Sequence, residues 1–278
     1  MNDRVPRDTL ANMTVRKPSQ VGHLLRYWRN ARKLSQLDVA LAAGISGRHL
    51  SFVETGRARP SQEMILRLSD VLDVPFRERN GLLAAGGFAA HYRETALGDD
   101  AMAPVKRAVD FILDHHHPYP AVALDRSWTV LQLNTAAARV MGHFVAAPIA
   151  PPFNTVRALF DERGFRPFIV NWEQVASALI QRLHRDAIAT GDEALRRLLA
   201  EMLAVDGVPD DWRSPNLEAP LEIILPITLR RDDLELSLFS TIATLGTPQD
   251  VTAQELQIET FFPADEASDA AVRRLAGD

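Results

Sequence analysis

Arginine, histidine and hydroxyl side chains gather on one short stretch of the sequence, from Ser46 to Arg59. Leu50 and Val53 mark the buried side of a helix predicted over Gly47–Glu54, which leaves Arg48 on its free side together with His49, Ser51 and Phe52. A guanidinium can donate two hydrogen bonds to a guanine edge, and hydroxyls bind phosphate oxygens. This surface therefore has the chemistry and the size to enter the major groove of DNA.

Local signals predict the two helices and the turn that position this surface. Ser35 is the expected N-cap of the first helix, with Asp38 bonding back toward it. Gly44 is expected to end that helix, because glycine adopts the left-handed backbone conformation at little cost in free energy. Ile45 fills the turn and Ser46 caps the second helix. A helical hairpin inside an enzyme or a scaffold is the alternative interpretation of this pattern.

The segment resembles the helix-turn-helix of the phage-repressor-like XRE family. The resemblance implies that Gln36 reaches a phosphate, and Arg48 is the candidate for reading a guanine edge. Phe52 is placed to touch a thymine methyl, while His49 and Ser51 suit either a base contact or a phosphate contact. Contacts to the DNA backbone would fix the position of the protein along the duplex, and the candidates for them are Ser46, Arg57 and Arg59. The alternative for the two arginines is a solvated loop. The matching residues are Ser35-Gln36, Ala40, Gly44-Ile45-Ser46, Leu50-Ser51, Glu54, Gly56-Arg57 and Arg59-Pro60.

Charge is distributed unevenly along the chain. Residues 1–97 hold 15 Lys and Arg against 9 Asp and Glu, a net of +6, whereas the remaining residues hold 16 against 27, a net of −11. A basic unit joined to an acidic one supports nucleic-acid binding by the first unit only. We expect the acidic part to lie away from the duplex.

Composition excludes several other functions. The sequence has no cysteine, which excludes disulfides, thiol catalysis and Cys-ligated metal sites and fits a cytoplasmic protein. It has no run of 18 apolar residues, so no membrane span is expected, and its first residues lack the apolar core of a signal peptide.

The 278 residues predict a multidomain chain. The expected organisation is a flexible segment 1–18, an all-α, five-helix, repressor-like DNA-binding domain 19–87, a connector 88–102 and a second domain 103–278. The helices of the first domain are expected at about 21–33, 36–43, 47–54, 61–72 and 76–85.

The second domain shows a different pattern, typical of an α+β fold. Period-2 alternation predicts strands at about 221–229 and 234–242, joined by a turn at Arg231–Asp233. Strands at about 121–125, 128–133 and 256–262 complete one antiparallel sheet, which we expect helices to cover on one face. Those helices are expected at about 103–115, 135–141, 155–162, 167–188, 192–204 and 267–276.

Scattered positions of this part form a recognisable set: Val122–Arg126, Trp128, Leu133-Asn134, Ala136-Ala137, Asn154, Leu159-Phe160, Trp172 and the closing hairpin. With these residues the second domain resembles the MmyB-like ligand-binding domain that follows an XRE helix-turn-helix in many bacterial regulators. The resemblance implies a PAS-like fold and a small apolar ligand such as a fatty acid. The family's histidine-glycine step is replaced here by Leu217–Pro220, which puts a contact from that loop in doubt.

A PAS-like domain encloses a pocket lined by alternate strand residues. Apolar residues on these strands are core residues by default, so each candidate has a structural alternative. Asn134 is expected to be a helix N-cap rather than a ligand contact. The candidate ligand-binding residues are Trp128, Leu131, Leu133, Phe160, Trp172, Ile223, Leu225, Leu236 and Leu238.

No signal for catalysis, a metal or a cofactor stands out. His115–His117 are adjacent residues that do not converge on one ion, so a solvated helix end is expected. We therefore expect a DNA-binding transcription regulator, dimeric on its operator, that senses a small apolar ligand. The alternatives are a second domain that serves only dimerisation or protein interaction, and an enzyme carrying a DNA-binding unit. The ligand, the operator and the direction of regulation do not follow from the sequence.

Overall fold

The computed structural model describes residues 20–214 and 224–277. The chain divides into two compact units, Met1–His91 and Tyr92–Asp278. The boundary falls inside 88–102, the range that the sequence predicts as a connector. None of the helices in the described part of the chain has the length and apolar character needed to cross a membrane.

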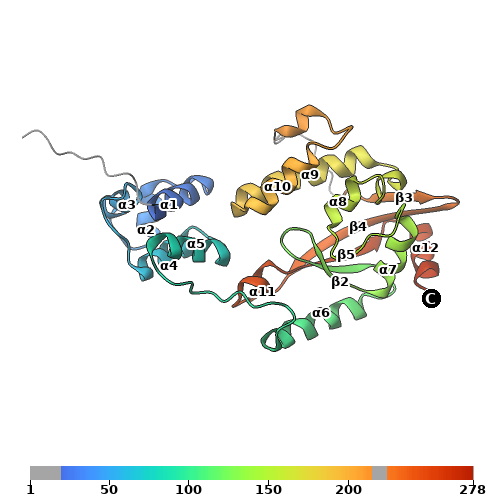
Figure 1. Ribbon diagram of the computed structural model, residues 1–278, viewed down its shortest axis with the longest axis horizontal. Helices are drawn as coiled ribbons and strands as arrows, with labels where there is room; N and C mark the ends of the chain where they lie inside the picture. The colour runs from blue at the N-terminus through green and yellow to red at the C-terminus, as the bar shows by residue number, and fades with distance from the viewer. Residues whose placement is uncertain (1–19, 215–223, 278) are drawn as a thin grey trace, which may run out of the picture. The chain divides into compact units, whose positions relative to one another are not determined.

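The described part of the first unit consists of five helices, as predicted (Figure 1). Their buried faces form one core, in which Leu25, Leu50, Ile65 and Leu82 are almost fully buried. The helices are α1 (Gln20–Ala31), α2 (Gln36–Ala42), α3 (Gly47–Glu54), α4 (Gln62–Val71) and α5 (Phe76–Gly86).

Short-range hydrogen bonds set the helix ends where the sequence predicts them. The hydroxyl of Ser35 accepts from the backbone of Asp38, whose carboxylate accepts from the backbone N–H of Ser35 at 3.0 Å, so the predicted capping box is confirmed. Ser46 caps α3 by accepting from the backbone of His49. Gly44 adopts a φ of 64°, the left-handed conformation that the turn requires.

The second unit is an α+β domain with a five-stranded sheet in the order β2-β1-β5-β4-β3. Every neighbouring pair is antiparallel, and β5 lies at the centre although it is the last strand in the chain. The predicted PAS-like class is confirmed. The strands are β1 (Ala121–Leu124), β2 (Val130–Leu133), β3 (Ile227–Arg231), β4 (Leu234–Thr244) and β5 (Gln257–Pro263).

Helices cover both faces of this sheet. Alternate residues of β1 point to opposite sides: Val122 packs in the core that α9 and α10 cover, and Ala123 packs against α6 (Figure 1). The expectation of helices on one face only was therefore wrong, because the buried side of α6 also needs a partner. The helices are α6 (Ala103–His115), α7 (Thr135–Phe144), α8 (Thr155–Phe160), α9 (Trp172–Thr190), α10 (Glu193–Met202), α11 (Val251–Glu255) and α12 (Glu266–Ala276).

Three elements differ from the sequence prediction. The helix expected at 167–188 is interrupted, because Ile169 forms a bridge to Leu229 and the N–H of Val170 donates to Thr228 at the sheet edge. Only a 3₁₀ turn, Arg166–Phe168, precedes α9. The short helix α11 was not predicted. The strand expected at 221–229 begins only at Ile227, and residues 224–226 are not part of a strand. Residues 221–223 lie outside the described residues, as does the loop Leu217–Pro220.

Candidate functional site

The outer side of α3 carries an aromatic ring between two guanidinium groups. The guanidinium carbon of Arg48 lies 5.2 Å from the ring centre of Phe52, and that of Arg57 lies 5.8 Å from it. Phe52 is half-buried, whereas both arginines are exposed. The ring therefore supports two cations at the surface by cation–π attraction, one from within the helix and one from the segment after it.

A buried ionic network holds α1, α2 and α3 together beneath this surface. Arg29 donates from Nε to Glu54 Oε1 at 2.7 Å and from Nη2 to Oε2 at 3.1 Å, and Gln36 Nε2 donates to the same Oε2 at 2.8 Å. Gln36 is thus anchored at the start of α2 by a residue at the end of α3. The role of Arg29 was not predicted, because its partner lies 25 residues away in the sequence.

The eight predicted DNA-binding residues come together in α2, α3 and the segment that follows. None of them is fully buried, so each presents some polar or apolar surface to solvent. Ser46, Arg48, Arg57 and Arg59 are exposed, and Gln36, His49, Ser51 and Phe52 are half-buried.

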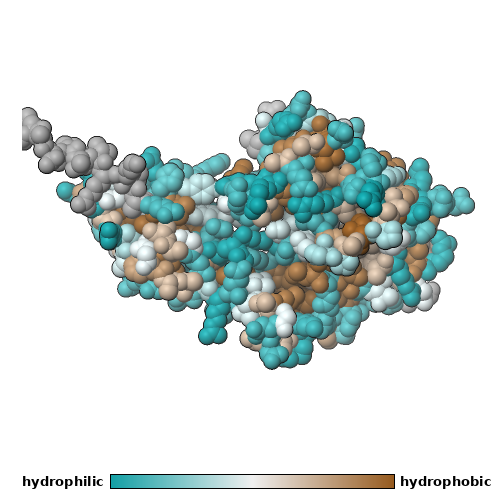
Figure 2. Space-filling model, in the orientation of Figure 1, coloured by the Kyte–Doolittle hydropathy of each residue, from teal (hydrophilic) through white to brown (hydrophobic). Residues whose placement is uncertain are grey.

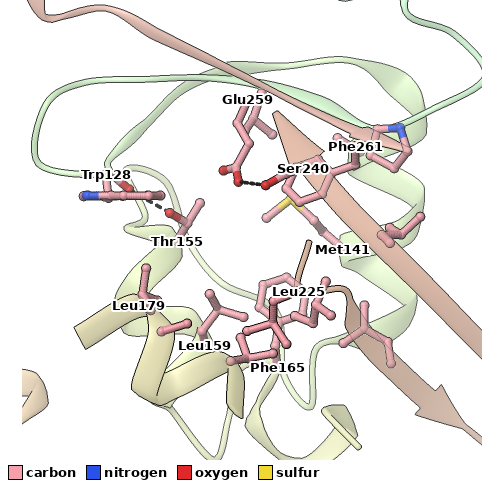
Figure 3. Close-up of a pocket in the computed structure, with 18 of the residues that line it drawn as sticks. Trp128, Met141, Thr155, Leu159, Phe165, Leu179, Leu225, Ser240, Glu259 and Phe261 are labelled. Carbon is pink, nitrogen blue, oxygen red and sulfur yellow. Dashed lines mark hydrogen bonds between the residues drawn. The ribbon is translucent and has the colours of Figure 1, made fainter. Parts of the chain in front are cut away.

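The second unit contains a cavity of about 550 Å³ between the sheet and helices α7, α8 and α9 (Figure 3). Its wall is mainly apolar, with Met141, Leu159, Phe165, Leu179 and Phe261 among the contributing side chains. This volume lies within the range of small-molecule sites, which are concave, mostly apolar and equipped with a few polar groups.

Three of the predicted ligand-binding residues line this cavity: Trp128, Leu225 and Leu238. The others lie elsewhere. Leu131 is exposed on β2, and Ile223 lies outside the described residues. Leu133, Phe160, Trp172 and Leu236 pack in the hydrophobic clusters of the domain rather than on the cavity wall.

Three charged residues that were not predicted as ligand-binding residues also line the cavity: Glu259, Arg182 and Arg185. Glu259 is 9% exposed, and burial raises the pKa of its carboxyl group, against the hydrogen bond from Ser240 and the charge of Arg182. A glutamate inside a predicted strand was the available signal, since such a residue on the buried face of a strand is unusual.

Trp128 is held in a left-handed backbone conformation at the cavity wall, with a φ of 66°. Asp125 supports the turn that leads into it, because its carboxylate accepts from the backbone of Ser127 at 2.8 Å and of Thr129 at 2.9 Å. The Arg182 guanidinium carbon lies 4.7 Å from the centre of the Trp128 ring. Left-handed conformations of bulky residues are rare and concentrate at binding and active sites.

Asn134 and His116 both form hydrogen bonds within the second unit. Asn134 caps α7, accepting from Ala137 at 2.8 Å while its amide donates to backbone oxygens, as predicted. His116 is half-buried, and its Nε2 lies 2.9 Å from the carbonyl oxygen of Phe261. The expectation of a solvated helix end was therefore wrong for this histidine, because it contacts β5, whereas His115 and His117 are exposed. The described residues contain no group of three or more His, Cys, Asp or Glu arranged to hold a metal ion.

A helix-turn-helix unit followed by a PAS-like domain with an apolar cavity defines this chain as a DNA-binding transcription regulator. Residues 105–275 match the family model described as the MmyB-like transcription regulator ligand binding domain, and residues 25–79 match a helix-turn-helix family model. The chain belongs to the MmyB-like transcription regulators.

No curated protein sequence matches this chain. Among solved structures, the "Structure of an RNA-binding Light-Oxygen-Voltage Receptor" shares 14% identity with this chain, with a TM-score of 0.26. The comparison covers 94% of this chain but only 64% of that chain, which is under two thirds of its length.

Proposed function

We propose that a small, largely apolar molecule binds in the cavity of the second unit and changes the affinity of this regulator for its operator. The observation that carries the proposal is the cavity of about 550 Å³, because a well-packed core leaves few voids larger than a water molecule. A ligand can shift DNA binding only if it has different affinities for the DNA-competent state and the other state. The family resemblance implies a fatty acid as one candidate.

The first test is mass spectrometry of small molecules released from the purified full-length protein. A co-purifying apolar compound, added back to stripped protein, should raise the melting temperature by binding the folded state. It should also change the dissociation constant for an operator obtained by selection from random DNA. If no compound from a broad panel of fatty acids, alcohols and aromatic metabolites alters either quantity, the second unit serves protein interaction or dimerisation instead.

We further propose that Arg48 and Phe52 contact bases, and that the exposed arginines after α3 contact phosphates. The exposed positions of Arg48, Arg57 and Arg59 support this assignment. Phosphate contacts make affinity strongly dependent on salt, whereas base contacts set sequence preference. Each residue is therefore substituted separately, and the salt dependence of the affinity and the sequence preference are measured. A smaller salt dependence indicates a lost phosphate contact, and a relaxed sequence preference indicates a lost base contact.

We also propose that the regulator acts as a homodimer. Apolar surface is visible on the second unit in the space-filling view (Figure 2), and Phe111 on α6 is 61% exposed. In the first unit, Leu37 and Leu41 on α2 are 62% and 71% exposed. Exposed apolar side chains on helices suit contact with a second copy. Light scattering of the protein alone and on DNA measures the stoichiometry.

A further inference from the structure

One acidic group lies in the mainly apolar wall that the sheet contributes to the cavity. Glu259 sits on the central strand β5, directly opposite Val122 of β1 and Ile242 of β4. Its side chain reaches from the strand into the cavity, beside Ser240 (Figure 3). Among the described residues that line the cavity, Glu259 is the only acid. An acid at the centre of a sheet does not stabilise the core, because burial of a carboxyl group disfavours its charged form.

Only part of the hydrogen-bonding capacity of Glu259 is satisfied within the described residues. Ser240 donates its hydroxyl proton to Oε1 at 2.7 Å, and the other oxygen receives no hydrogen bond from them. Arg182 faces the same cavity from α9, but it pairs with Asp186 at 3.5 Å and stacks over Trp128. Glu259 therefore has a hydroxyl neighbour and a free oxygen, but no ion-pair partner among these residues.

The surrounding charges discriminate between possible head groups of a ligand. An ammonium group would require two charges to be taken out of water, and Arg182 and Arg185, which line the cavity from α9, would repel it. A carboxylate beside Glu259 would put a second acid in the same buried place, where the two groups cannot both ionise without repulsion. It is better placed beside Arg185, which is exposed. A neutral group that both donates and accepts hydrogen bonds avoids both penalties. A protonated Glu259 can donate from its free oxygen, and Ser240 and the carboxyl oxygens can accept.

We propose that Glu259 and Ser240 form a subsite for a neutral hydroxyl or primary amide group on the ligand, whose apolar remainder fills the rest of the cavity. The inference rests on the proposed ligand-binding function and specifies its chemistry. It places the polar group of the ligand against β4 and β5 rather than beside the arginines of α9. Burial raises the pKa of the Glu259 carboxyl group, which favours retention of the proton that this hydrogen bonding uses.

The test compares four ten-carbon probes with the same tail: 1-decanol, decanamide, decanoic acid and decylamine. Binding to the stripped full-length protein is measured by calorimetry at neutral pH. We expect decanol and decanamide to bind about three- to tenfold more tightly than the two charged probes, as one additional net hydrogen bond would give. Tightest binding by decanoic acid or by decylamine would overturn the subsite.

Two variants locate the effect at Glu259. Glu259→Gln keeps a neutral hydrogen-bonding group and should retain decanol and decanamide binding. Glu259→Leu should lose about three- to tenfold in affinity for both, with melting curves confirming that it is folded. Glu173→Leu on the exposed face of α9 is the control and should behave as the parent protein. Unchanged decanol binding by Glu259→Leu would also overturn the subsite.

The outcomes separate this proposal from the broader one. If all four probes bind with equal affinity, a ligand cavity exists but the subsite does not. If none of them binds to folded protein, and no other apolar compound alters DNA binding, the proposed ligand function fails together with the subsite. Binding of decylamine that is abolished in Glu259→Gln would show that the residue acts as an ionised partner of a cationic ligand.

Discussion

Arg29 and Glu54 form a two-point ion pair that joins α1, the first helix of the DNA-binding unit, to the end of α3. The two nitrogen–oxygen distances are 2.7 and 3.1 Å, and the side chains are 12% and 2% exposed. Parallel donation from a guanidinium to a carboxylate fixes orientation as well as distance. The pair therefore sets the angle at which α3 presents Arg48.

Breaking this pair should destabilise the first unit strongly. Glu54→Ala leaves the charge of Arg29 buried without its partner, which costs about 3–5 kcal/mol in comparable cases. Hydrogen exchange of the α3 backbone amides in the full-length protein measures the loss. Glu63→Ala is a matched control, because its pair with Arg67 is exposed and worth less than about 1 kcal/mol. Equal effects of the two substitutions would show that burial of the pair is unimportant.

Gly22 permits the close approach of α1 to the end of α3. An added Cβ would collide with the backbone oxygen of Val53 and lie 3.0 Å from that of Glu54. Gly22→Ala should therefore cost about 1–3 kcal/mol through overpacking, despite the better helix propensity of alanine. Gly81→Ala is the control, because no atom lies within 4 Å of its new Cβ, and it should stabilise α5 by about 0.5–1 kcal/mol. A stabilising Gly22→Ala would refute the contact.

Arg48→Ala should weaken operator binding by about 1–3 kcal/mol and relax the preference at one base pair, as expected when two hydrogen bonds to a guanine are lost. Selection from random DNA, followed by titration of single-base variants, measures both effects. Arg67→Ala on the exposed face of α4 is the control and should leave sequence preference unchanged. Equal weakening on every sequence would assign Arg48 to a phosphate contact instead.

Leu225 and Leu236 should respond differently to enlargement. Leu225 lines the cavity, so Leu225→Phe should fill it and reduce ligand affinity while the domain remains folded. Leu236 is fully buried in the core, so Leu236→Phe should destabilise the domain by about 1–3 kcal/mol through overpacking. Thermal melting with and without ligand separates these effects. A reversed pattern would place the cavity elsewhere in the sheet.

Glu259 should make the stability of the second unit depend on pH. Burial raises the pKa of its carboxyl group above the ordinary value of 4.5, so the native state binds more protons than the unfolded state above that pH. The contribution of this group to stability therefore falls as the pH rises from the pKa of the unfolded state to the raised pKa of the folded state. The melting temperature of Glu259→Gln minus that of the parent protein should increase from pH 4.5 to pH 8. A constant difference would indicate an unshifted pKa.

The sequence alone determined the DNA-binding unit, because its deciding interactions are local. Ser35 bonds to Asp38, Ser46 bonds to His49, and Gly44 closes the turn between them, so each signal lies within a few residues of its partner. Such short-range hydrogen bonds and left-handed turns depend on residue type more than on distant packing. The buried pair of Arg29 and Glu54 was not accessible in this way, because packing of separate helices brings its members together.

Tertiary structure decided the cavity. Leu236 and Leu238 alternate correctly on β4 and share one face, yet the first fills the core and the second lines the cavity. Period-2 alternation identifies a buried face but not where the covering helices leave space above it. Likewise, Ser240 and Glu259 meet only because β5 enters the sheet beside β4. The apolar pattern therefore determined which faces are buried, and the order of strands and the packing of helices decided which buried residues can reach a ligand.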